Sequence, residues 1–282
     1  MSIVTDTRPA GNAPARATGP HLKVTGRRVL RSEWAKLWSL RSTWITLGLG
    51  LLFLLAFGTI AALRYKSMLD SGQPMDPDFA DDTAYSLALF GLPFSLIALG
   101  VLGVLTASGE YTSGMIRSTL AAVPRRLPVL WSKATVYGVL AFVTATLGAL
   151  IGFLISSSVL SGTAIAMNLS DTGVLRGLLG AGLYLGLVGV IGVALGTLLR
   201  STAGGISALV GTFLLVPGLM SLLPKSWRAD ITPYLPSNAG ESIFALQHPA
   251  GTLSAGAGLL VLLGWTVLAL GGAAYRLMRS DA

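Results

Sequence analysis

The segment from Leu178 to Leu199, LLGAGLYLGLVGVIGVALGTLL, contains neither a charged residue nor a proline. A helix of about 20 mostly apolar residues can cross the hydrocarbon core of a bilayer. Six segments of this kind are expected: Trp44 to Leu63, Ala84 to Thr106, Ala134 to Ile155, Leu178 to Leu199, Ala203 to Leu223 and Ala255 to Tyr275. The sequence therefore predicts an all-α polytopic membrane protein with six transmembrane helices.

The composition of the chain supports this fold class. Of its 282 residues, 52% are hydrophobic and 11% are charged, whereas a soluble domain has about 25% charged residues. Residues 1–22 are rich in Pro, Gly, Ala and Thr and are predicted to form a disordered cytoplasmic tail. We expect residues 23–282 to form a single six-span membrane domain.

The distribution of charge predicts the orientation. The side that contains both termini has 15 of the 20 Lys and Arg residues and four acidic residues, whereas the other side has five and eight. Cytoplasmic flanks carry the excess of Lys and Arg, so both termini are expected in the cytoplasm. The net charge of +8 then reflects membrane orientation, and no nucleic-acid partner is expected.

The segment from residue 24 to residue 40 precedes the first span and has a helical pattern. Large apolar residues occupy one half of the helical wheel and basic or hydroxyl residues the other. The apolar half contains Val29, Leu30, Trp34, Leu37, Trp38 and Leu40, and the polar half contains Arg28, Arg31, Ser32, Lys36 and Ser39. This pattern predicts an amphipathic helix along the inner leaflet. Its role is either to anchor the protein or to act mechanically in gating.

None of the six predicted spans has a charged residue near its centre. Ion-coupled transporters usually need an intramembrane acidic or basic side chain that binds or relays the ion. This absence argues against an ion-coupled transporter, although backbone carbonyls of broken helices remain an alternative way to hold sodium.

No catalytic, cofactor-binding or metal-binding residue is expected. The chain has no cysteine and only two histidines, His21 and His248, which excludes thiolate and histidine-based zinc sites. Ser207 has no histidine base at its depth. The phosphate-binding pattern GxxxxGK[ST] is absent, so the chain is not expected to hydrolyse ATP or to be an enzyme.

The outer connection over residues 224–250 is proline-rich and only partly polar. It is interpreted either as a broken re-entrant or interfacial helix at membrane depth, which would make it a candidate outer gate, or as a simple loop. Pro93 and Pro217 are expected to kink the second and fifth spans. The pairs Gly148-xxx-Gly152, Gly182-xxx-Gly186 and Gly192-xxx-Gly196 are expected to allow close helix packing.

The cytoplasmic connection from Ser108 to Lys133 reads SGEYTSGMIRSTLAAVPRRLPVLWSK. Thr112 or Ser113 is expected to cap a short helix that ends at Pro124. One face of that helix would carry a ridge of Met115, Ile116, Thr119, Leu120 and Val123, and charged residues would surround the ridge at Glu110, Arg117, Arg125 and Arg126. The loop either offers this ridge to a soluble partner or folds back onto the bilayer.

Two stretches resemble a known family. They are EWAKLWSLRSTW over residues 33–44, and GEYTSGMIR over residues 109–117, followed by Pro124-Arg125-Arg126 and Lys133. With the six-span plan, the whole chain resembles the permease subunits of type-2 ATP-binding-cassette (ABC) exporters, particularly those of actinobacteria. Met115 stands where many members of the family have threonine.

The resemblance implies a coupling loop that docks on a separate cassette ATPase subunit, which would bind ATP and Mg²⁺. The implied coupling residues are Glu110, Tyr111, Gly114, Met115, Ile116, Arg117, Leu120, Pro124, Arg125 and Arg126. The interfacial-helix residues that would touch lipid and ATPase are Glu33, Trp34, Lys36, Leu37, Trp38 and Arg41.

The resemblance also implies a second permease copy or a paralogue, in a bacterial plasma membrane. The expected substrate is hydrophobic or amphipathic: an antibiotic, a peptide or a lipid-like molecule. Two alternatives remain. One is an ATP-independent secondary transporter or channel, and the other is a membrane-embedded assembly or immunity protein that transports nothing.

Overall fold

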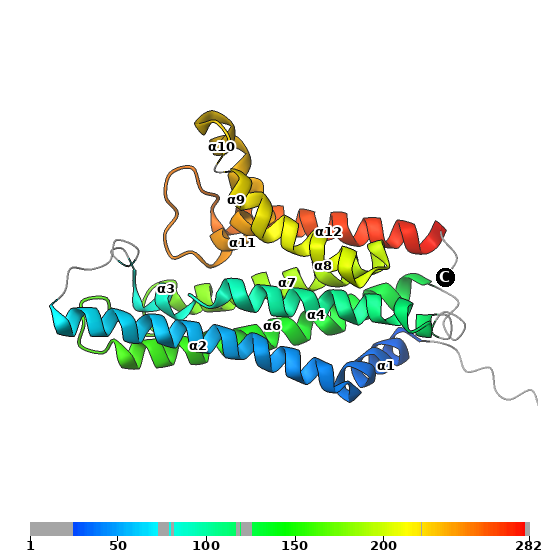
Figure 1. The fold of residues 1–282 in the computed structure, drawn as a ribbon, viewed down its shortest axis with the longest axis horizontal. Coiled ribbons are helices and arrows are strands. Elements are labelled where there is room, and N and C mark those ends of the chain that lie inside the picture. Colours follow the sequence, from blue (N-terminus) through cyan, green and yellow to red (C-terminus); the bar gives the residue numbers. More distant parts are fainter. Residues whose placement is uncertain are drawn as a thin grey trace, which may run out of the picture.

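The structure of the chain is a computed structural model that describes residues 25–72, 79, 82–116, 119, 126–220 and 222–279. These residues form helices and their connections, without a β-strand in the described ranges (Figure 1). The all-α class is therefore confirmed. The predicted disordered tail, residues 1–22, lies outside the described residues.

Six helical segments are long and apolar enough to cross a membrane. They are Arg41–Ser71, Ala84–Thr112, Arg126–Val159, Val174–Leu199, Thr202–Met220 and Ala255–Arg279. All six predicted spans are present, and most helices extend beyond the predicted ends. Hydropathy marks only the apolar part of a helix, whereas backbone hydrogen bonding continues into its polar ends. The 34 residues of α6 (Arg126–Val159) extend roughly 51 Å, compared with about 30 Å for the hydrocarbon core.

The N-terminal part consists of α1 (Gly26–Ser39) and α2 (Arg41–Ser71), separated only by Leu40 in an extended conformation. The helix α1 matches the predicted helix over residues 24–40. It packs against α6 and against α2. Its position along a bilayer surface remains a prediction.

The second span is interrupted near Pro93, as predicted. A short helix, α3 (Ala84–Ala88), is followed by a turn, and α4 (Leu92–Thr112) then begins with Pro93 in its first turn. Proline is favoured there because the first N–H groups of a helix have no intrahelical partner. Because α4 continues to Thr112, Glu110 and Tyr111 lie on this helix, and the connection to α6 is shorter than the predicted loop over residues 108–133.

The fifth span consists of three segments around Pro217. They are α8 (Thr202–Val210), a π-helical turn η2 (Gly211–Leu215) and α9 (Val216–Met220). The N–H of Val216 bonds to the carbonyl of Gly211, five residues earlier. Proline lacks an N–H and crowds the preceding turn, so this departure from α-helical bonding just before Pro217 agrees with the predicted interruption.

The connection over residues 224–250, which is predicted to lie on the outer side, is mostly helical and is not a simple loop. It contains α10 (Lys225–Ile231), a 3₁₀ turn η3 (Thr232–Tyr234) and α11 (Pro236–Phe244), and the chain then leads to α12 (Ala255–Arg279). The helix α11 packs against both α7 (Val174–Leu199) and α12.

The helix α7 lies at the centre of the bundle and contacts α4, α6, α8, α11 and α12. A Cβ atom on Gly192 would overlap the carbonyl of Gly100 in α4, and a Cβ atom on Gly196 would lie 2.5 Å from the carbonyl oxygen of Val104. The predicted packing role of Gly192-xxx-Gly196 is thus confirmed. The absence of side chains at these two positions lets the backbones of α4 and α7 touch.

The two ends of the bundle differ in the segments they contain. Figure 1 places α1, the last turn of α4, the α7–α8 connection and the end of α12 at one end, and α10 toward the other. We call the first the basic end. It brings together the segments to which the charge distribution assigned the excess of Lys and Arg, and its cytoplasmic location remains a prediction.

Candidate functional site at the basic end of the bundle

Four charged side chains from three helices meet at the basic end. They are Glu33 and Lys36 on α1, Glu110 on α4 and Lys133 on α6, and we call them the four-charge cluster. Lys133 donates hydrogen bonds to Glu33 Oε2 at 2.7 Å and to Glu110 Oε1 at 2.9 Å. Lys36 donates to Glu33 Oε1 at 2.7 Å and to Glu110 Oε1 at 2.8 Å. Each lysine thus bridges both carboxylates, and the cluster has no net charge.

Three of the four side chains in the cluster are almost completely removed from solvent. Glu33 is 2% exposed, Glu110 4% and Lys133 7%. Burying an unpaired charge costs several kcal/mol, which an ion pair offsets only when the geometry is close. The four side chains therefore hold one another in place, and removal of any one leaves a buried charge with fewer partners.

Lys36 is the most accessible member of the cluster, with its side chain 29% exposed. Burial alone would lower the pKa of Lys36, but the hydrogen bonds and charges of Glu110 and Glu33 outweigh burial and raise this pKa above its usual value of 10.5. Lys36 is therefore charged at neutral pH. Its Nζ also lies 3.5 Å from the hydroxyl oxygen of Thr119, in the connection between α4 and α6.

Glu110 also borders a small cavity. Its Oε2 atom is buried and has no hydrogen-bond partner within the described part of the chain. Glu110 lines a cavity of about 20 Å³, together with Ile116, Val129 and Leu277. This volume is sufficient for one water molecule. Ile116 is therefore part of the packing beneath the loop.

A second set of contacts ties the end of α4 to the connection between α7 and α8. The guanidinium carbon of Arg200 lies 5.2 Å from the centre of the Tyr111 ring, within the range of a cation–π interaction. The hydroxyl groups of Ser108 and Thr202 are 3.0 Å apart. The last two turns of α4 are thus held by α1 and α6 through charges and by the α7–α8 connection through Tyr111 and Ser108.

The predicted coupling loop is described in part. Gly114 has a φ of +71°, a left-handed conformation that glycine adopts without strain, and it turns the chain after α4. Met115 is 43% exposed, whereas Ile116 is 7% exposed. The predicted apolar ridge is therefore only partly accessible, because Ile116 faces the protein. The predicted coupling residues Arg117, Leu120, Pro124 and Arg125 lie outside the described residues.

The predicted cap of the loop helix remains a prediction, because that helix lies partly outside the described residues. The hydroxyl groups of Thr112 and Ser113 donate to the carbonyl of Gly109, at 3.1 and 2.7 Å. They therefore satisfy a carbonyl group in the last turn of α4. Arg126, at the start of α6, donates to the carbonyl of Leu277 in α12 at 2.9 Å, which links the end of the loop to the last span.

The interfacial-helix residues divide between two faces of α1. Glu33 and Leu37 are buried against the bundle, whereas Trp34 and Trp38 are 45% and 54% exposed. The Trp34 and Trp38 rings stack 5.4 Å apart, and Trp38 packs edge-on against Trp44 at 4.4 Å. Arg41 is also exposed at this junction. Exposed tryptophans beside a cation are typical of the boundary between lipid and water, which agrees with the predicted location of α1.

At the other end of the bundle, α11 is attached by its last carbonyl groups. Arg176 of α7 donates to the carbonyls of Ala245 and Ile243, at 2.8 and 3.3 Å. The Tyr85 hydroxyl donates to the carbonyl of Phe244 at 2.6 Å. These side chains satisfy carbonyl groups that the end of a helix leaves without partners. They fix α11 to α3 and α7.

The same helix brings an acidic residue to the depth of the spans. A Cβ atom on Gly240 would overlap the ring of Tyr184. Tyr184 lies ten residues after Val174, the first residue of α7, and thus roughly 15 Å along that helix. Glu241 follows Gly240. No span has a charged residue near its centre, but α11 holds Glu241 alongside the half of α7 that begins at Val174, which the sequence analysis missed.

Lys133 is the other functional candidate that sequence analysis did not include among the site residues. The sequence offers little indication of a functional role for Lys133, because Lys133 is one of several basic residues near the ends of spans. A comparison with protein-family models and a comparison with curated proteins both gave no match. The geometry of the chain itself therefore carries the functional interpretation.

Proposed function

We propose that this chain is the membrane-spanning permease subunit of a type-2 ABC exporter, driven by a separate cassette ATPase. The observation that carries the proposal is the four-charge cluster. The two stretches that resemble the family are far apart in the sequence, and the cluster joins them: Glu33 and Lys36 belong to the first, and Glu110 with Lys133 to the second. A permease that is moved by an ATPase needs such a rigid connection between its docking segment and its spans.

In this proposal, a force on the connection between α4 and α6 passes directly into the bundle. The cluster resists separation of α1, α4 and α6, because separation would leave charges unpaired in a buried environment. The contact between Tyr111 and Arg200 extends the same rigid unit to the α7–α8 connection. Closure of two ATPase subunits would then move whole helices and rock the bundle between inward-open and outward-open states.

The docking surface would be centred on Met115. This side chain directly follows Gly114 and is exposed, and a few anchor side chains that become buried contribute most of the binding energy at protein interfaces. A cassette ATPase would supply a groove for Met115, bind ATP and Mg²⁺, and act on a second permease copy or a paralogue. The exported substrate would be hydrophobic or amphipathic, and the location a bacterial plasma membrane.

The test is co-purification. The affinity-tagged chain is extracted from its native membranes in mild detergent, and the proteins that bind it are identified by mass spectrometry. We expect the chain to bind a protein that has the GxxxxGK[ST] motif and ATPase activity. We expect this protein to be lost from the purified complex when Met115→Asp places a charge at the anchor. Met278→Asp, an exposed methionine at the same end on α12, is the matched control and should retain the partner. Unchanged association of Met115→Asp would contradict the docking assignment.

A second candidate function is an ATP-independent secondary transporter. The observation in its favour is Glu241, because an acidic group held alongside a span is of the type that ion-coupled transporters use. Purified chain in liposomes, given an ion gradient and no nucleotide, distinguishes the two. Substrate uptake under these conditions would favour the second candidate, whereas uptake that requires the ATPase and ATP would favour the first.

A further inference from the structure

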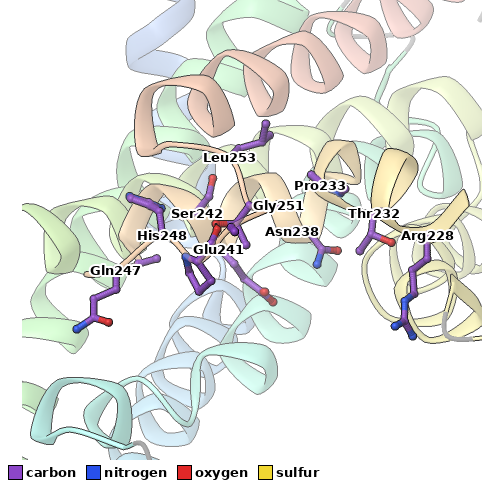
Figure 2. Close-up of a pocket in the computed structure, with 15 residues that line it drawn as sticks. Arg228, Thr232, Pro233, Asn238, Glu241, Ser242, Gln247, His248, Gly251 and Leu253 are labelled. Atoms are coloured by element: carbon purple, nitrogen blue, oxygen red, sulfur yellow. The ribbon is translucent and has the colours of Figure 1, made fainter. Parts of the chain in front are cut away.

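A cavity of about 510 Å³ lies beside α11, away from the basic end. It is an open cavity lined by residues of α10, η3, α11 and the chain from Ala245 to Leu253 (Figure 2). Sites for small molecules typically have volumes of about 300 to 1,000 Å³. The cavity is therefore large enough for an organic molecule, and far larger than a metal ion needs.

The lining of the cavity combines a few polar groups with an apolar wall. Glu241, Asn238 and Ser242 project from α11, and Pro233 and Leu253 contribute apolar surface. The Ser242 hydroxyl donates to the carbonyl of Ala239 at 2.8 Å, so its oxygen can still accept a hydrogen bond. A small number of polar groups in an apolar wall is the usual composition of a small-molecule site.

Glu241 has no counter-ion in this cavity. Within the described ranges, no Lys, Arg or His nitrogen lies within 4.0 Å of its carboxylate, and no hydrogen bond to the carboxylate is formed. Arg228 and His248 also line the cavity, and Figure 2 shows Asn238 between Glu241 and Arg228. The Glu241 side chain is exposed to the cavity.

An unpaired carboxylate in a cavity can bind a cation, and the other groups in the cavity indicate the type of cation. A metal ion prefers several oxygen ligands, but in the part of the chain that the structure describes no group of three or more Asp, Glu, His or Cys is placed to hold one. No Phe, Tyr or Trp lines the cavity, so the aromatic cage that recognises quaternary ammonium groups is absent from this described wall. A primary or secondary ammonium group matches better, because its N–H groups can bond to the carboxylate of Glu241 and the amide oxygen of Asn238.

We propose that the cavity beside α11 binds an amphipathic organic amine in its protonated form, with the Glu241 carboxylate as the counter-ion of the ammonium group. The apolar part of the amine lies against Pro233 and Leu253. This inference rests on the proposed function and narrows its substrate class from hydrophobic or amphipathic molecules to amphipathic amines. Because α11 is fixed to α7 through Arg176, the site moves with the central helix of the bundle.

The test is equilibrium binding to the full chain in lipid nanodiscs, without an ATPase. The probe is dansylcadaverine, a primary alkylamine with a fluorescent apolar group, and its N-acetylated form is the neutral control. We expect the amine to bind at least tenfold more tightly than the neutral form, and Glu241→Gln to remove this difference. Asp70→Asn, an exposed acidic residue on α2 outside the cavity, should bind as the unaltered chain does.

A second variant tests the proposal in case Glu241→Gln does not fold. Leu253→Trp keeps the carboxylate and fills the apolar side of the cavity from a segment outside the helices, so it should also weaken amine binding at least tenfold. Equal binding of the charged and neutral probes, or unchanged amine binding in both variants, would overturn the proposal. Because no ATPase is present, failure here is distinguishable from failure of the permease assignment, which the co-purification experiment tests separately.

Discussion

The Nζ atom of Lys133 on α6 lies 2.7 Å from Oε2 of Glu33 on α1, although 100 residues separate them in the sequence. This ion pair fixes α1 to the bundle from the inside. A helix that served only as a lipid anchor would need no buried charge contact with a span. The pair therefore favours a mechanical role for α1.

Lys133→Met should destabilise the protein strongly. Glu33 and Glu110 would then share only Lys36, and breaking a buried ion pair by removing one partner costs about 3 to 5 kcal/mol. The expected result is a lower apparent melting temperature in detergent, as measured by tryptophan fluorescence. Lys66→Met on α2, a lysine for which no ion pair forms with the described residues, is the control. Adding Glu33→Gln to Lys133→Met should restore part of the loss, and an unchanged melting temperature in Lys133→Met would contradict this account.

The contribution of Lys36 should disappear only at alkaline pH. Its pKa is raised in the folded protein above the usual 10.5, so its stabilising effect is fully present below that value and is lost as the pH rises through the folded-state pKa. The difference in melting temperature between the unaltered chain and Lys36→Met should therefore be constant from about pH 7 to about pH 10 and then shrink. Arg31→Met, an exposed cation on the same helix, should show no such dependence. A difference that already fades between neutral pH and about pH 9 would show that Lys36 has no raised pKa.

Arg176→Gln should loosen α11. The substitution removes the donors to the carbonyls of Ala245 and Ile243, which would be left without partners at the end of the helix. Because the chain has no cysteine, Ser237→Cys introduces a single thiol at a position that is 5% exposed. Maleimide should label this thiol faster in the Arg176→Gln background. Equal labelling rates with and without Arg176→Gln would mean that other contacts hold α11.

Gly192→Ala should destabilise the contact between α4 and α7, because the added Cβ atom overlaps the carbonyl of Gly100. Gly264→Ala is the matched control, since nothing lies within 4 Å of a Cβ atom at this position in α12. In the control, alanine should be neutral or stabilising by up to about 1 kcal/mol, because glycine is unfavourable within helices. Thermal unfolding of the two variants in the same detergent measures the contrast, and equal effects would remove the proposed role of Gly192.

The sequence by itself determined the six apolar helices and the segregation of basic residues. Both are properties of residues summed along the chain, because a span is recognised from its local hydropathy and an orientation from the flanks of each span. Pro93 and Pro217 likewise act on their own helices, and the structure shows an interruption at each.

Only the tertiary structure decided which distant residues meet. The charges of Glu33, Glu110 and Lys133 were visible in the sequence, but their pairing depends on how α1, α4 and α6 pack in space. The depth of Glu241 depends on α11 docking against Tyr184 rather than on the residues of α11. Hydropathy along a chain reports the transfer of each residue from water to lipid, whereas an ion pair or a cavity depends on distances between atoms that the order of the residues does not specify.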